Sequence, residues 1–206
     1  MRIFLLSPAS LGGERARWIL EERGKSDLAR RLRSREGAPL GEVYTFLSSL
    51  YFRGKLTYSS VFSNPPPGVP GALIITPGEG LRSPEDRVDL PRLLSMAKVP
   101  ITAKNERYCE PLFRDALKLV EQAGPECDVV LLGSVATGKY VDVLLPVFGT
   151  RLRFPVDFVG RGDMSRGGLL LRRAERREEL EYAVIESAAR HGPRPPRLEK
   201  RPRPGS

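Results

Sequence analysis

The chain has 206 residues, of which 40% are hydrophobic and 29% charged, so it is long enough for one substantial core and short for two. Its 34 lysines and arginines exceed its 25 acidic residues, and the resulting net charge of +9 favours a polyanionic partner. A single histidine and two cysteines without metal-ligand spacing argue against Ser-His-Asp, Cys-His and zinc chemistry. No apolar run approaches the roughly 18 residues that span a bilayer, and the N-terminus lacks a secretory signal. We therefore expect a cytoplasmic protein that uses no metal and no cofactor.

The first half of the chain alternates short apolar runs with amphipathic segments. Residues 2–6 form an apolar run that predicts a buried strand, and residues 14–32 have the periodicity of one bent or broken helix. Residues 39–62 predict a second helical region, which three prolines then end. A second buried strand is expected at residues 72–75, followed by a Gly/Pro loop and a short helix at residues 89–97.

The second half continues the alternation and adds a glycine-rich stretch. The expected elements are an edge strand at 99–102, a helix at 108–123, a strand at 128–132, a helix at about 139–148 and a strand at 151–154. Residues 159–168 combine four glycines with two arginines and predict a flexible basic loop, with a short helix or strand from residue 169 onward.

This βα alternation predicts a three-layer α/β/α domain with a mostly parallel central sheet over residues 1–189. We expect this domain to act as a monomer. Residues 190–206 contain five prolines and carry a net charge of +5, which is typical of a disordered basic tail. Such a tail is either an arm that binds nucleic acid or a solvated extension, and the sequence leaves both readings open.

The loops that follow the predicted strands are the first place to look for a site, because ligands of open α/β sheets bind outside the carboxyl ends of the strands. In the third loop, Gly133, Gly138 and Lys139 satisfy the G-x-x-x-x-G-K spacing of a P-loop. Tyr140 stands where a magnesium-binding Ser or Thr is required, so nucleotide hydrolysis ranks last. The start of the following helix favours an anion such as a nucleic-acid phosphate, although a plain strand-to-helix turn explains the pattern equally well.

Three segments of the chain are similar, in the same order, to segments of a known family. They are GEVYTFLSSLYFRGKLTYSSVF, LIITPGEGLRSP and KYVDVLLPVFGTRLRFPVDFVGRGDMSRGGLLLR. Over roughly residues 44–171 the chain resembles an uncharacterised branch of the uracil-DNA-glycosylase-like α/β superfamily. That group includes enzymes that extrude a base and cut its N-glycosidic bond, and domains of enzymes that handle 7-deazaguanine in transfer RNA. The loop SPASLGG lacks the carboxylate and aromatic of the uracil enzymes' GQDPYH, and the HPSP motif does not occur. Uracil itself is therefore not the expected base.

The resemblance implies a DNA glycosylase that flips and excises a modified base of double-stranded DNA, and the basic composition is similar to that of an anti-phage enzyme acting on hypermodified, for example glucosylated, cytosine. The alternatives are a non-catalytic nucleic-acid-binding module and a nucleoside or nucleotide N-glycosidase or base-modification enzyme.

N-glycosidic cleavage passes through an oxocarbenium-like state, so a glycosylase needs a carboxylate near the sugar, donors for the base and groups that hold phosphates. Asp163 is the first candidate carboxylate, although an Asp between two arginines also suits a local ion pair. Glu42, which also suits a helix cap, and Glu79 come next. The candidates for the base pocket are Ser7, Ser10, Tyr44, Thr76, Gly78 and Gly80. Those for phosphate contact are Arg53, Lys55, Ser134, Thr137, Lys139, Arg161 and Arg166.

Overall fold

A six-stranded mixed sheet in the order β4-β3-β1-β6-β7-β8 forms the centre of the protein. The computed structural model describes residues 1–20, 26–196 and 198. The four inner strands are parallel: β3 (Ala72–Thr76), β1 (Arg2–Leu6), β6 (Asp128–Leu132) and β7 (Leu152–Pro155). Two strands of three residues each, β4 (Gly80–Arg82) and β8 (Tyr182–Val184), pair antiparallel at the two edges.

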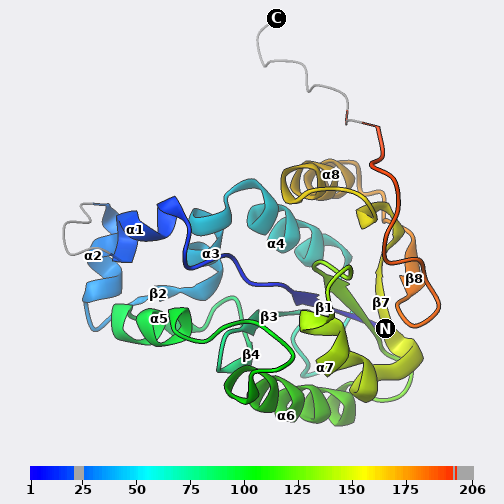
Figure 1. The fold of residues 1–206 in the computed structure, drawn as a ribbon, viewed down its shortest axis with the longest axis horizontal. Helices are drawn as coiled ribbons and strands as arrows, with labels where there is room; N and C mark the ends of the chain where they lie inside the picture. Colours follow the sequence, from blue (N-terminus) through cyan, green and yellow to red (C-terminus); the bar gives the residue numbers. More distant parts are fainter. Residues whose placement is uncertain (21–25, 197, 199–206) are drawn as a thin grey trace, which may run out of the picture.

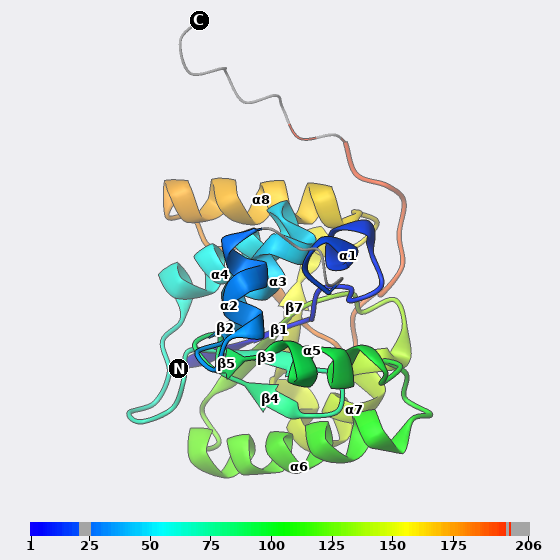
Figure 2. The same ribbon diagram turned by 90° about the vertical axis from the view of Figure 1, so that its left-hand side faces the viewer.

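Helices cover both faces of this sheet, which gives three layers (Figures 1 and 2). One face is covered by α4 (Leu50–Phe62) and α8 (Asp163–Arg176). The core beneath them continues into α1 (Glu14–Leu20), α2 (Asp27–Arg33), α3 (Leu40–Ser48) and α5 (Leu90–Ala97), which lie toward the carboxyl ends of the strands (Figure 1). The other face is covered by α6 (Glu106–Ala123) and α7 (Gly138–Phe148). A small second sheet pairs β2 (Ala38–Pro39) with β5 (Arg87–Val88), and two 3-10 turns, η1 (Gly149–Arg151) and η2 (Val156–Phe158), flank β7.

The inner strands are apolar throughout because both of their faces are buried. In β1, Phe4 and Leu6 belong to the core under α4 and α8, whereas Ile3 and Leu5 belong to the core over α6 and α7. The alternation of side chains along a strand thus divides one apolar run between two cores.

Local signals set several helix boundaries. The side chain of Asp89 accepts a hydrogen bond from the backbone N–H of Arg92 at 2.9 Å and begins α5. Between α3 and α4 the chain breaks at Ser49, whose φ of +47° lies in the region that L-residues rarely adopt. This break divides the expected helical region 39–62 into two helices and turns the start of α4 toward the carboxyl ends of the strands.

The structure confirms the expected strands at residues 2–6, 72–75, 128–132 and 151–154 to within about one residue. The helices expected near residues 89–97, 108–123 and 139–148 are likewise present as α5, α6 and α7. Residues 14–32 hold two helices, α1 and α2, and part of the stretch between them lies outside the described residues.

Two sequence-based expectations are wrong. Residues 99–102 form no strand, because β4 folds back from β3 and occupies that edge of the sheet. Residues 159–168 are not a loop throughout, because α8 begins at Asp163 and contains Gly167 and Gly168. Packing against α4 compensates for the poor helix propensity of these two glycines.

Residues 190–196 have no regular secondary structure, and the expected disorder of the tail falls largely on residues outside the described part of the chain. Within the described tail, the carbonyl oxygen of Pro196 accepts a hydrogen bond from the guanidinium of Arg161 at 3.3 Å. Among the described residues, none of the helices has the length and apolar character needed to cross a membrane.

Candidate functional site

A pocket of about 470 Å³ opens at the carboxyl ends of the inner strands. Its walls include the loop after β1, Pro77 after β3 and Ser134 after β6. The chain leaves β1 toward β3 and leaves β6 toward β7, so neighbouring strands send their connections in opposite directions at this point. Open α/β sheets bind their ligands at such a switch point, and the volume is typical of sites for small molecules or single nucleotides.

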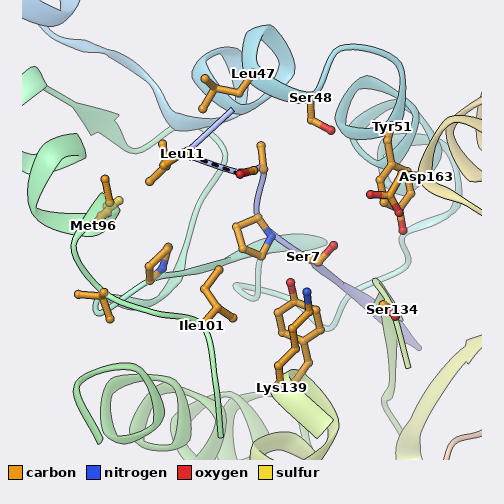
Figure 3. Close-up of a pocket in the computed structure, with 18 residues that line it drawn as sticks. Ser7, Leu11, Leu47, Ser48, Tyr51, Met96, Ile101, Ser134, Lys139 and Asp163 are labelled. Carbon is orange, nitrogen blue, oxygen red and sulfur yellow. Dashed lines mark hydrogen bonds between the residues drawn. The ribbon is translucent and has the colours of Figure 1, made fainter. Parts of the chain in front are cut away.

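Polar and apolar groups line different sides of this pocket (Figure 3). Figure 3 shows Tyr51 and Asp163 on one side, Lys139 and Ser134 on another and Ser7 between them. Leu11, Leu47, Met96 and Ile101 form an apolar wall on the side away from Asp163. The site therefore offers hydroxyls, one carboxylate and one amine next to a surface that suits a flat apolar ring.

Asp163 is the acidic residue among those that line the pocket. It is the first residue of α8, where the helix dipole favours a negative charge. Its side chain is 71% exposed, and its nearest cationic partner is Arg166, whose Nη1 lies 3.6 Å from Asp163 Oδ1. Because the ion pair is long and the Asp163 carboxylate is largely exposed, carboxylate oxygens remain available to a ligand.

Behind the pocket wall, Lys55 contacts Ser7. The Lys55 ammonium donates hydrogen bonds to the carbonyl oxygen of Ser7 at 2.5 Å and to Ser7 Oγ at 2.9 Å. Ser7 in turn donates from its hydroxyl to the carbonyl oxygen of Leu132, the last residue of β6, at 3.1 Å. Burial lowers the pKa of Lys55 to about 7, because removing an ammonium from water disfavours its charged form.

Two tyrosines complete the inner part of the pocket. Tyr51 on α4 is 5% exposed, and its buried hydroxyl lies beside Ser7 and Arg166 but makes no hydrogen bond of ordinary geometry with a described residue. Tyr140 on α7 is 3% exposed. Burial raises the pKa of both phenols far above 10, so both hydroxyls carry their protons at neutral pH and can donate to a ligand.

The start of α7 is less suited to an anion than the sequence pattern indicates. A Cβ atom placed on Gly138 would lie within 2 Å of Asp142 Oδ2, so the Asp142 carboxylate covers the first turn of this helix. A phosphate at the same place would meet that negative charge. Lys139, whose Nζ lies 5.0 Å from the ring centroid of Tyr140, remains at the rim of the pocket as a cationic group.

The structure brings together Ser7, Ser10, Ser134, Lys139 and Asp163 of the residues predicted from the sequence. The remaining carboxylate candidates lie elsewhere. Glu42 accepts two hydrogen bonds from Arg31 on α2. Glu79 accepts from Arg92, with 2.6 Å between Arg92 Nη2 and Glu79 Oε2.

The other residues expected in the base pocket do not line it. Thr76 is fully buried and donates to the carbonyl oxygen of Gly80 at 2.8 Å, so both belong to the β3–β4 turn. Gly78, with a φ of +80°, lies in the same turn. Gly80 packs against α6, where a Cβ would lie 2.6 Å from the carbonyl oxygen of Pro111. Tyr44 is buried in the core on α3.

Several residues expected to hold phosphates are engaged within the protein. Arg166 is 8% exposed and donates to the carbonyl oxygen of Phe158 at 3.0 and 3.2 Å. Arg161 donates to the carbonyl oxygen of Asp157 at 2.9 Å and to Pro196 of the tail. Lys55 is only 1% exposed and cannot reach a phosphate at the surface. Arg53 and Thr137 are exposed but do not line the pocket.

Sequence reasoning did not assign a site role to Tyr51 or Tyr140. Both belong to helices whose apolar stripes read as core, and both are indeed buried. Their position could have indicated a site role, because each lies in the first turn of a helix that starts near the strand ends.

No group of three or more His, Cys, Asp or Glu side chains that could hold a metal ion occurs in the part of the chain that the structure describes. No family model, curated protein or solved structure matches the chain.

Proposed function

We propose that the protein is a DNA glycosylase that takes a modified base out of double-stranded DNA into this pocket and hydrolyses its N-glycosidic bond. The observation that carries the proposal is the exposed carboxylate of Asp163 facing a pocket lined by hydroxyls at the switch point of the sheet. The three-layer arrangement around a mostly parallel sheet agrees with the uracil-DNA-glycosylase-like fold that the sequence resembles.

The chemistry assigns different roles to the two sides of the pocket. When the bond from C1′ to the base nitrogen breaks, its electron pair leaves with the base and the sugar becomes positively charged. The carboxylate of Asp163 stabilises this cation and accepts a proton from the water that adds to C1′. Hydroxyls such as those of Ser7 and Tyr51 donate to the base, and the apolar wall of Leu11 and Met96 packs against its ring.

The net charge of +9 supports DNA as the carrier of the base, since phosphates supply most of the affinity in such complexes. Lys139 at the rim is the side chain placed to contact a flanking phosphate. Both cysteines, Cys109 and Cys127, are free thiols, which fits action in the reducing cytoplasm. Hypermodified cytosine of phage DNA is the first substrate to test, because of the resemblance described above.

The proposal is tested by incubating the purified protein with duplexes that contain unmodified, uracil or glucosyl-hydroxymethylcytosine bases. Abasic sites and released bases are then measured by gel and mass spectrometry. We expect the wild type to release a modified base and Asp163→Asn to lose this activity by about 1,000-fold while its DNA affinity stays within about twofold. Asp157→Asn, a nearby carboxylate outside the pocket, is the matched control and should keep wild-type activity.

Wild-type cleavage by Asp163→Asn would refute the assigned mechanism. Intact DNA in every sample, with hydrolysis of free nucleosides instead, would make the protein a nucleoside N-glycosidase. Salt-sensitive binding with no cleavage of either substrate would make it a binding module.

A further inference from the structure

Lys55 is a buried cation without a carboxylate partner among the described residues. Its side chain is 1% exposed, and no described acidic side chain lies within ion-pair distance of it. Its ammonium lies 4.3 Å from the ring centroid of Tyr51 and 4.8 Å from that of Phe52. Its hydrogen bonds go to the carbonyl and the hydroxyl of Ser7, which lines the pocket.

The charges around Lys55 do not neutralise it. Asp163 and Arg166 on α8 and Lys139 on α7 are the charged groups that act on it, which is one carboxylate against two further cations. Buried charges in proteins are normally paired, because an unpaired one is costly to remove from water. Positive charge therefore exceeds negative charge around Lys55.

The hydrogen bond to the Ser7 carbonyl, which holds the chain at the end of β1, does not require a charged donor. A neutral donor satisfies a backbone carbonyl at a smaller desolvation cost than an ammonium. The ammonium has a second effect, because it occupies a lone pair of Ser7 Oγ and so leaves the Ser7 hydroxyl as a donor. That proton now points to the carbonyl oxygen of Leu132, and it can turn to an acceptor in the pocket.

We propose that Lys55, acting through Ser7, stabilises the negative charge that develops on the departing base, and so fixes the base at the inner end of the pocket and the sugar at Asp163. The inference rests on the proposed function. As the N-glycosidic bond breaks, its electron pair delocalises over the base onto a ring oxygen or nitrogen, which accepts the Ser7 proton as a hydrogen bond. The released base later takes a proton from water. Lys55 is thus a positioning residue, and Ser7 is the group that touches the base.

The protonation of Lys55 makes this effect dependent on pH. Only the ammonium supplies the charge, and burial brings its pKa to about 7. We therefore expect kcat/KM of the wild type to fall as the pH rises above about 7. Variants that carry no charge at this position should lack this descending limb.

The first test separates the effect of the Lys55 charge from the effect of its hydrogen bonds to Ser7. Lys55→Gln keeps an N–H donor for Ser7 without the charge, Lys55→Met keeps neither, and Lys118→Met on α6 is an exposed control outside the pocket. Base release is measured at pH 6 and at pH 9 on duplexes that carry the modified base that the wild type releases. The wild type carries the ammonium at pH 6 and has largely lost it at pH 9, because burial brings the pKa of Lys55 to about 7. We expect Lys55→Gln and Lys55→Met to release the base about 100-fold more slowly than the wild type at pH 6 and at about the same rate at pH 9. An equal loss at both pH values, or full activity of Lys55→Gln at pH 6, would overturn the inference.

The second test does not depend on turnover or on the stability of one variant. Free 5-fluorocytosine, cytosine and 5-methylcytosine are titrated into the wild type, Ser7→Ala and both Lys55 variants, and binding is measured by calorimetry. We expect the wild type to prefer the most acidic base by about tenfold and the variants to lose this preference. A wild type that releases no base would refute the glycosylase, and this titration would still decide the role of Lys55. If all folded variants kept the wild-type preference for the most acidic base, the role assigned to Lys55 would be overturned.

Discussion

The backbones of Gly54 and Gly167 touch where α4 crosses α8. A Cβ atom on Gly54 would lie 2.8 Å from the carbonyl oxygen of Gly167, and one on Gly167 would lie 2.7 Å from Cα of Tyr51. This close approach brings the first turn of α8, with Asp163, to the side of the pocket where Tyr51 lies (Figure 3). The two glycines therefore set the distance between the carboxylate and the tyrosine of the candidate site.

Replacing Gly167 by alanine should force the two helices apart. We expect the free energy of unfolding to fall by about 1–3 kcal/mol, as for other overpacked contacts, and activity to fall with it. Gly168→Ala is the matched control on the same helix, because its Cβ would make only ordinary contact with Leu198 at 3.4 Å. That variant should be neutral or stabilised by up to about 1 kcal/mol through better helix propensity. Chemical denaturation of both variants checks the difference, and equal stabilities would contradict the packing argument.

The buried hydroxyl of Tyr51 should matter to the ligand and not to the fold. Tyr51→Phe removes a buried hydroxyl that lies beside Ser7 and Arg166 but makes no hydrogen bond of ordinary geometry, so the free energy of unfolding should change by less than about 1 kcal/mol. Base release should fall by about tenfold or more, because a donor to the ligand is lost. Tyr44→Phe removes another buried and unpartnered hydroxyl outside the pocket, and it should change neither quantity. Thermal melts and kinetics of the pair measure both effects, and similar kinetics for the two variants would assign Tyr51 to the core alone.

Lys139 at the pocket rim should contribute to DNA affinity through charge. Lys139→Ala should reduce the slope of log affinity against log salt by about one, since one phosphate contact is lost. Lys118→Ala removes an exposed lysine on α6 away from the pocket and should leave the slope unchanged. Fluorescence anisotropy at several salt concentrations gives both slopes. Equal slopes for the two variants would place the DNA elsewhere on the surface.

Lys55 should also impose a pH dependence on stability. Its pKa is about 7 in the folded protein and near its ordinary value of 10.5 in the unfolded chain. Between pH 7 and pH 10.5 the unfolded chain holds one proton more than the folded protein. The free energy of unfolding of the wild type, relative to that of Lys55→Met, should therefore rise by up to about 1.4 kcal/mol per pH unit. Below pH 7 the difference should be constant. Urea denaturation of both proteins from pH 6 to 9.5 measures it, and a flat difference would show that Lys55 keeps its charge.

The sequence predicted the parallel strands well because each is an apolar run with both faces buried, as in β1, β3 and β6. It missed β4 and β8, since three residues are too few to show a period. Asp163 was expected in a loop because four neighbouring glycines disfavour a helix, and only the contact between α8 and α4 makes that helix stable.

In the candidate site, the strand-end rule pointed to the loops that hold Ser7, Ser10 and Ser134, and these three residues line one pocket. Lys55 was expected at the surface because lysine is rarely buried. Its burial follows from the position of α4 over the end of β1, and sequence periodicity does not contain that information. The pairings of Glu42 with Arg31 and of Glu79 with Arg92 join separate segments and were equally out of reach.

The short antiparallel strands at both ends of the sheet have a consequence for self-association. In the described part of the chain, the edge strands β4 and β8 have only three residues each. A second chain that added a strand there would gain few hydrogen bonds, so a protein with a strongly apolar parallel centre is protected against edge-to-edge aggregation.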